Sequence, residues 1–171
     1  MEIMVMKRIG GIILVMLCCM TLFGGCGKKI KETITNRKIP FDDVTEFYYT
    51  YENINFNASF QRYRFYREGG KYMFQHETRE KPGEYGPTTE EDITNTGTFE
   101  LTAEEWKDFL SLLKDGTVKA RKDSGESGET GPWMFIYWRN DKEKYQVFAF
   151  PSYDARVCFE EFCSAIAHAE R

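Results

Sequence analysis

The chain has 171 residues, of which 42% are hydrophobic, 16% aromatic and 29% charged, and its formal net charge is −4. The acidic balance argues against a general nucleic-acid-binding protein, because such binding depends on a basic surface that neutralises phosphates. The high aromatic content, beside an ordinary charged fraction, argues against a disordered chain and for a globular domain.

The first 25 residues have the pattern of an export signal. Lys7 and Arg8 form a short positive region, an apolar run follows, and Gly24 and Gly25 supply the small residues of a peptidase site. The apolar run is short for a helix that crosses a bilayer, which needs about 20 residues. We therefore expect residues 1–25 to be a cleaved signal peptide. An uncleaved N-terminal anchor, or an ordinary signal cut nearby, stays open as an alternative.

The run ends in Leu22-Phe23-Gly24-Gly25-Cys26, which resembles the lipobox of bacterial lipoproteins. In that family the signal peptide is cut before the cysteine, and the cysteine thiol carries a diacylglyceryl group. The resemblance implies a covalent lipid at Cys26 and a membrane-anchored, extracytoplasmic location. It departs from the family pattern at Phe23, where leucine is usual. We expect no cofactor apart from this lipid.

Residues 26–42 are polar and charged and show no clear hydrophobic period. This composition predicts a flexible tether that carries the lipidated cysteine, with a reach of about 20 Å. The remaining residues, 43–171, are enough for a single folded domain with one core.

Three strands are predicted in the first half of the domain, over Val44 to Tyr51, Phe56 to Arg67 and Lys71 to Arg79. Gly69-Gly70 predicts a tight hairpin between the second and third, because glycine accepts the positive φ that such turns require. The aromatic residues of the second strand change parity near Gln61-Arg62, which predicts a β-bulge there.

A helix is predicted from Ala103 to Asp115, after a short strand from Thr96 to Leu101. Thr102 and Glu105 have the spacing of a capping box, and Gly116 is the expected helix stop. One face of this helix carries apolar residues at the spacing i, i+3, i+4, i+7, namely Trp106, Phe109, Leu110 and Leu113.

Two more strands, Trp133 to Arg139 and Lys144 to Phe150, form a predicted hairpin. A C-terminal helix follows, capped by Ser152 or Asp154. The order β-β-β-(β)-α-β-β-α predicts an α+β fold, a two-layer antiparallel sheet of about five strands with two helices on one face.

No catalytic or metal-binding motif stands out, so we expect a protein that is not an enzyme. His76 and His168 lack a cysteine or carboxylate at metal-ligand spacing. Cys158 and Cys163 lie about 140° apart around the predicted C-terminal helix, which argues against a disulfide between them.

Aromatic residues occupy both parities of the predicted strands, whereas two helices can cover only one face of a sheet. The second face is therefore a candidate contact surface, since tyrosine, tryptophan and arginine are favoured at such surfaces. Stacking of the rings across strands, for sheet stability alone, is the other interpretation. The candidate residues are Tyr48, Arg62, Tyr63, Arg64, Tyr66 and Trp138.

The sequence thus predicts a lipid-anchored, non-enzymatic module that binds an envelope protein, peptide or glycan, with the membrane as its other partner and no nucleic acid. An envelope hydrolase, or an inhibitor of one, acting near the cell wall is an alternative. A structural or assembly subunit is another.

Overall fold

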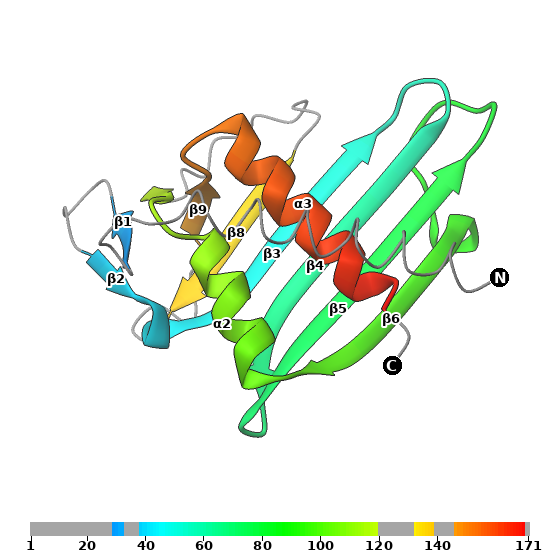
Figure 1. Cartoon of the computed structure of the whole chain (residues 1–171). Coiled ribbons are helices and arrows are strands. Elements are labelled where there is room, and N and C mark those ends of the chain that lie inside the picture. The colour runs from blue at the N-terminus through cyan, green and yellow to red at the C-terminus, as the bar shows by residue number, and fades with distance from the viewer. Residues whose placement is uncertain (1–28, 33–37, 120–131, 139–145, 170–171) are drawn as a thin grey trace, which may run out of the picture.

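The computed structural model describes residues 29–32, 38–119, 132–138 and 146–169. The predicted signal peptide and Cys26 lie outside these residues. The described chain is an α+β structure, a large sheet with two helices packed against it (Figure 1). None of these helices has the length and apolar content that a membrane span requires.

The sheet has nine strands, in the spatial order β2-β1-β7-β9-β8-β3-β4-β5-β6. In chain order the elements are β1 (Lys29–Glu32), β2 (Lys38–Pro40), η1 (Phe41–Asp43), β3 (Val44–Asn53), β4 (Ala58–Glu68), β5 (Lys71–Lys81), η2 (Glu90–Asp92), β6 (Ile93–Leu101), α2 (Ala103–Leu112), β7 (Thr117–Lys119), β8 (Trp133–Trp138), β9 (Gln146–Ala149) and α3 (Tyr153–Ala167). The prediction of about five strands is wrong. Seven strands, β3 to β9, come from the predicted domain, and two come from the predicted tether.

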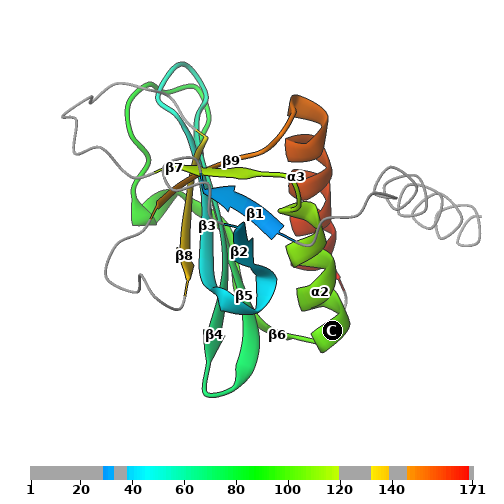
Figure 2. The same cartoon turned by 90° about the vertical axis from the view of Figure 1, so that its left-hand side faces the viewer.

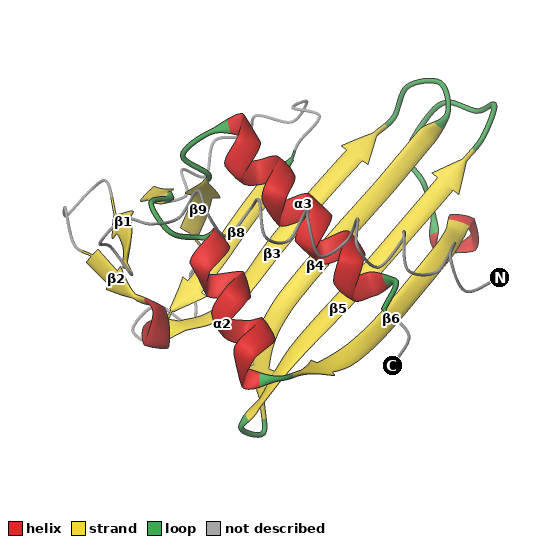
Figure 3. Ribbon diagram, in the orientation of Figure 1, coloured by secondary structure: helices red, strands yellow, loops and turns green. Residues whose placement is uncertain are grey.

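Consecutive antiparallel pairs join β3, β4, β5 and β6, and α2 then carries the chain back across the sheet to β7. The predicted hairpin of β8 and β9 is present, and β8 pairs with β3. Among the described pairs only β1 with β7 is parallel. Figure 2 and Figure 3 show α2 and α3 on the same side of the sheet, as the sequence predicts.

The prediction of a flexible tether is wrong for the residues of β1 and β2. These two strands pair with each other, and β1 also pairs with β7. Ile30 is fully buried and Ile39 is 1% exposed. Each is a single apolar residue in a short polar run, too few to show a period. Part of the predicted tether therefore belongs to the sheet, with these two side chains in the core.

The N-terminus of α2 is the capping box predicted from the sequence. The Thr102 hydroxyl accepts a hydrogen bond from the Glu105 amide, and the Glu105 carboxylate accepts one from the Thr102 amide at 2.8 Å. At the other end the left-handed residue is Asp115, with φ 62°, rather than Gly116. Glycine is needed at 116 for a different reason, because a Cβ there would lie 2.2 Å from the Phe148 ring.

The core between sheet and helices is a cluster of phenylalanines. The rings of Phe65 on β4 and Phe109 on α2 stack in parallel, 4.0 Å apart with an interplanar angle of 2°. Phe47 on β3 makes edge contacts with Phe109 and with Phe159 of α3 at 5.8 and 5.4 Å. Offset and edge-to-face packing of this kind adds to the hydrophobic gain from burial. One strand residue thereby contacts both helices.

The bulge predicted near Gln61-Arg62 is wrong. The register of β4 with β3 and with β5 runs through this point without a shift. Phe60 and Arg62 therefore share one face of β4, while Tyr63 and Phe65 share the other. The aromatic residues of β4 change parity because both faces of the strand carry rings.

The phenylalanine cluster predicts the cost of truncating one ring. Phe109→Ala should lower the free energy of unfolding by about 3–5 kcal/mol, because it removes a fully buried side chain and leaves a cavity. Urea denaturation followed by circular dichroism measures this loss. In the matched control, Phe56→Ala, the ring is 54% exposed and the loss should stay below about 1 kcal/mol. Equal losses for the two variants would contradict this description of the core.

Candidate functional site

The face of the sheet opposite α2 and α3 carries the candidate site. We call it the open face. Side chains alternate between the two faces of a strand, so the printed register fixes which residues share it. Its central residues are Glu46, Tyr48 and Thr50 of β3, Phe60, Arg62, Arg64 and Tyr66 of β4, Met73, Gln75, Glu77 and Arg79 of β5, and Trp133, Phe135 and Tyr137 of β8.

Four of the six predicted contact residues lie together on the open face, namely Tyr48, Arg62, Arg64 and Tyr66. All four are partly buried. Tyr48 lies directly opposite Arg64 in the pairing of β3 with β4. These residues form a mixed aromatic and cationic surface, as the parity of the aromatic residues indicates.

The assignment of Tyr63 and Trp138 to a contact face is wrong, because both lie on the helix-covered side of the sheet. Tyr63 is 4% exposed and packs on Phe74, with ring centroids 5.9 Å apart. Trp138 is 1% exposed and lies opposite Val44 in the pairing of β3 with β8. The alternation of β4 and β8 places them in the core.

Arg64 is the centre of the open face. Its Nε donates a hydrogen bond to Oε1 of Glu46 at 2.5 Å, and its Cζ lies 4.1 Å from the Tyr66 ring centroid and 5.3 Å from that of Tyr48. The Tyr48 ring contacts Tyr137 of β8 edge-on at 6.3 Å. We call these five residues the Arg64 cluster. Three adjacent strands contribute to it, so the sheet itself fixes its geometry.

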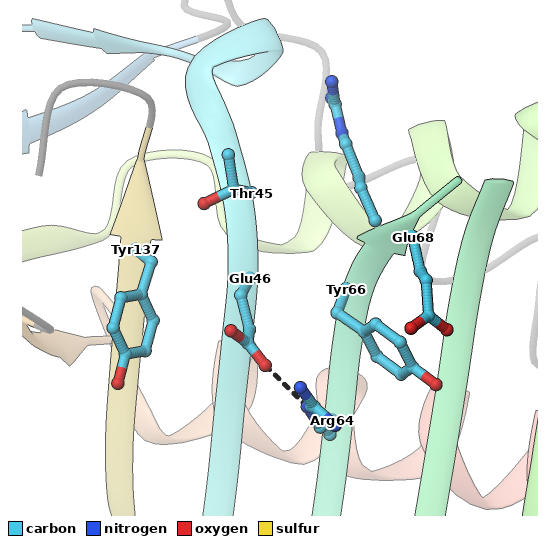
Figure 4. A pocket seen from close by; sticks show the side chains of 7 residues that line it. Thr45, Glu46, Arg64, Tyr66, Glu68 and Tyr137 are labelled. Carbon is cyan, nitrogen blue, oxygen red and sulfur yellow. Dashed lines mark hydrogen bonds and ion pairs between the residues drawn. The ribbon is translucent and has the colours of Figure 1, made fainter. Parts of the chain in front are cut away.

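A hollow of about 470 Å³ lies beside the Arg64 cluster (Figure 4). Figure 4 shows the dashed contact from Glu46 to Arg64, with Tyr137 on one side and Tyr66 on the other. The hollow is broad and open rather than an enclosed cavity, so it suits a ligand that lies along the surface. Its lining residues are Thr45, Glu46, Arg64, Tyr66, Arg67, Glu68 and Tyr137.

A second group of cations surrounds Phe60 at the far end of β4. The Cζ atoms of Arg62 and Arg79 each lie 4.9 Å from the centroid of the Phe60 ring, which is 8% exposed. Arg79 also pairs with Glu77 at 2.6 Å. The two guanidiniums thus cover an aromatic side chain on the uncovered side of the sheet, by cation–π contact and by their apolar stems.

Two groups of the Arg64 cluster, Tyr48 and Arg64, have raised pKa values. Burial, and then the hydrogen bond to Glu46, raise the pKa of Tyr48 to about 12, so its phenol stays protonated at neutral pH. Burial acts to lower the pKa of Arg64, but the hydrogen bond and charge of Glu46 outweigh it and raise that pKa. Tyr48 and Arg64 thus offer a ring and N–H donors to a ligand, and neither is a base that titrates near pH 7.

Glu46, Tyr137 and Phe60 are members of the open face that the sequence prediction missed. The available signal was the period of two, since Glu46 is two residues before Tyr48 and Phe60 two before Arg62. The neighbour relation of Tyr137 to Tyr48 depends on β8 lying next to β3, which no local pattern specifies.

His76 lies on the other side of the sheet, in the core, whereas His168 is exposed. His76 is 2% exposed, with its ring stacked at 6.0 Å on Phe74 and at 5.7 Å on Phe99. Gly97 makes room for it, since a Cβ at 97 would lie 2.8 Å from His76 Nε2. His168, at the end of α3, accounts for part of the electrostatic effect on His76. The described residues include no group of three or more side chains that could hold a metal ion.

The two described cysteines lie on α3 and form no disulfide, as the helical spacing predicts. Cys163 is fully buried, and burial raises the pKa of its thiol well above the ordinary value. A buried thiol of this kind is a small apolar core residue rather than a reactive nucleophile.

Comparison of the chain with protein-family models, with curated proteins and with solved structures finds no match. The geometry and chemistry of its own residues are therefore what bears on its function.

The position of His76 predicts a pH dependence of stability. Burial, with the charge of His168, lowers the pKa of His76, so the unfolded chain binds this proton more readily than the folded chain. The stabilisation that the neutral His76 side chain contributes is complete above the pKa of histidine in the unfolded chain, about 6.5, and is lost as the pH falls below that value. The free energy of unfolding should therefore fall between pH 7 and pH 5, and His76→Gln should reduce that fall.

Denaturation curves at several pH values measure the effect. His168→Gln is the control, and it should retain most of the wild-type pH dependence, because burial is the larger cause of the shift at His76. If the free energy of unfolding of His76→Gln falls with pH as steeply as that of the wild type, His76 is not the cause of the pH dependence.

Proposed function

We propose that the chain is a lipid-anchored, extracytoplasmic and non-enzymatic binding module, which engages a protein, peptide or glycan of the bacterial cell envelope through its open face. The lipobox-like stretch ending in Cys26 supports the anchor and the location. The open face supports the binding role.

The observation that carries the binding role is the composition of the uncovered side of the sheet. An antiparallel sheet with helices on one face is ordinarily polar on the other. Here the uncovered side carries tyrosines, phenylalanines and a tryptophan interleaved with arginines. Aromatic residues and arginine are the types enriched where partners bind, since both offer large contact area with few degrees of freedom.

The Arg64 cluster is organised before any ligand arrives. The guanidinium is held by its hydrogen bond to Glu46 and by contact with two tyrosine rings, so little rotamer freedom is left to lose on binding. A guanidinium has five N–H donors, of which the Nε donor is used by Glu46. The remaining donors suit carbonyl, hydroxyl or carboxylate oxygens of a ligand in the hollow. The neighbouring rings suit its flat or apolar parts.

The binding role is tested with capture from solubilised envelopes. The full chain, wild type or Arg64→Ala, is immobilised in detergent, and bound proteins and wall fragments are identified by mass spectrometry. We expect a partner that wild type captures and Arg64→Ala loses at least tenfold, a loss of about 1.4 kcal/mol. Lys71→Ala is the matched control, because it removes an exposed cation that is 60% accessible, and it should capture as wild type does.

Arg64→Lys separates charge from geometry in the same experiment. It keeps the cation but loses the planar group that stacks on Tyr66, so it should also bind weakly. Equal capture by wild type, Arg64→Ala and Arg64→Lys would rule out the Arg64 cluster as the contact. Denaturation midpoints of the variants show whether each is folded.

The anchor is tested separately. Metabolic labelling of the expressing cells with a fatty-acid analogue should mark the wild-type chain and lose the mark in Cys26→Ala, because the thiol is the acceptor of the lipid. Mass spectrometry should find the mature wild-type chain beginning at Cys26. A labelled Cys26→Ala chain, or an unmodified wild-type chain that keeps residues 1–25, would contradict the anchor.

A further inference from the structure

The two edges of the sheet differ in how they are protected. β2 forms one edge and has only three residues, with Lys38 at one end and Pro40 at the other. β6 forms the other edge and has nine residues, with the sequence ITNTGTFEL. Exposed edges in soluble proteins are usually short, or carry lysine or proline, because unpaired backbone groups recruit further strands. β2 follows this rule. β6 has only a register shift near its start, between Ile93 and Asn95, and is regular from Asn95 to Leu101.

The hydroxyl contacts of β6 show which of its backbone groups point outward. Thr96 Oγ1 donates to the carbonyl of His76 at 3.0 Å, and Thr94 Oγ1 to that of Thr78 at 3.3 Å, so these carbonyls of β5 face β6. Their partners in the register are Gly97 and Asn95, which therefore face β5 in turn. Backbone groups alternate along an antiparallel strand. Those of Thr96 and Thr98 thus point away from the sheet.

The side chains of β6 leave this edge accessible. The hydroxyls of Thr94 and Thr96 are turned back onto β5, and Gly97 between the threonines has no side chain. The charged residue of the strand, Glu100, pairs with Lys71 of β5 at 2.6 Å. No described strand pairs with the outer side of β6.

We propose that β6 pairs with β6 of a second copy of this chain, antiparallel and about a two-fold axis at Gly97. In this register Thr96 lies opposite Thr98 of the partner subunit, and Glu100 falls opposite the start of the second β6, where the register with β5 shifts. Outward-facing residues thus meet outward-facing residues, as hydrogen-bonded antiparallel pairs require. Threonine pairs are favourable across strands, and no like charges face each other.

The second copy fits this edge better than the other strands of the same chain. The opposite edge, β2, has three residues and a proline, so pairing β6 with it would leave most of β6 uncovered. Pairing β6 with β6 of a second copy covers the long edge of both copies and closes the assembly as a dimer. Paired residues in an antiparallel sheet point to the same side, so the two open faces join into one continuous surface.

The test is photo-crosslinking in cells that express the full chain. Thr98→p-benzoylphenylalanine places a photoreactive side chain on the β6 edge, and irradiation should give a product with twice the mass of one chain. The matched control is Lys38→p-benzoylphenylalanine on the β2 edge, which should give no such product. Crosslinking to a different protein, or an equal dimer yield from position 38, would overturn the proposal.

A second substitution in the crosslinking chain tests the backbone pairing. Thr96→Pro removes an outward N–H and should abolish the dimer product, whereas the backbone hydrogen bonds of β6 to β5 are retained. Thr96→Lys should have the same effect by placing a charge on the edge, and it leaves the backbone unchanged. The denaturation midpoint confirms that each variant folds. A folded variant of either kind that dimerises as wild type does would overturn the pairing, whatever the open face binds.

Discussion

The contact between one face of the sheet and the two helices is the constraint on which the remaining structure depends. Phe47 on β3 touches α2 through Phe109 and α3 through Phe159, and Phe65 stacks on Phe109 from the next strand. These contacts fix which face of every strand is buried, because the side-chain period of two leaves no intermediate choice. The arrangement of the open face is a consequence of this packing.

The strongly local features of the fold could be predicted from the sequence. The capping box at Thr102, the glycine hairpin after β4 and the spacing of Phe159 and Cys163 on α3 each involve residues within a few positions of one another. The strands β1, β2 and β7 could not be predicted. They have three or four residues each, and their stability comes from pairing with segments far away in the chain. A short run around Ile30 or Val118 contains no pattern that signals such a partner.

The candidate site also has residues that could be predicted from the sequence and residues that could not. Tyr48, Arg62, Arg64 and Tyr66 were identifiable because the rings on both parities exceed what one covered face can bury. Tyr63 has the opposite parity to Arg62 and Arg64 and so lies in the core, whereas Phe60, which shares their parity, was overlooked. A change of aromatic parity along a strand has two physical causes, a bulge or rings on both faces. The sequence of one strand does not distinguish them, whereas the continuous register does.

Charge pairing decides what kind of recognition the open face can support. Glu46 neutralises Arg64, and Glu77 neutralises Arg79, so the ionic groups largely compensate one another at short range. Long-range attraction of a charged polymer needs a surplus of one sign, and this surface does not provide it. Recognition would depend instead on stacking and on directional hydrogen bonds from the fixed guanidinium. Such contacts act only at close range and so favour an extended ligand that lies flat on the sheet. The dimer inferred from the β6 edge would lengthen this surface without changing its chemistry.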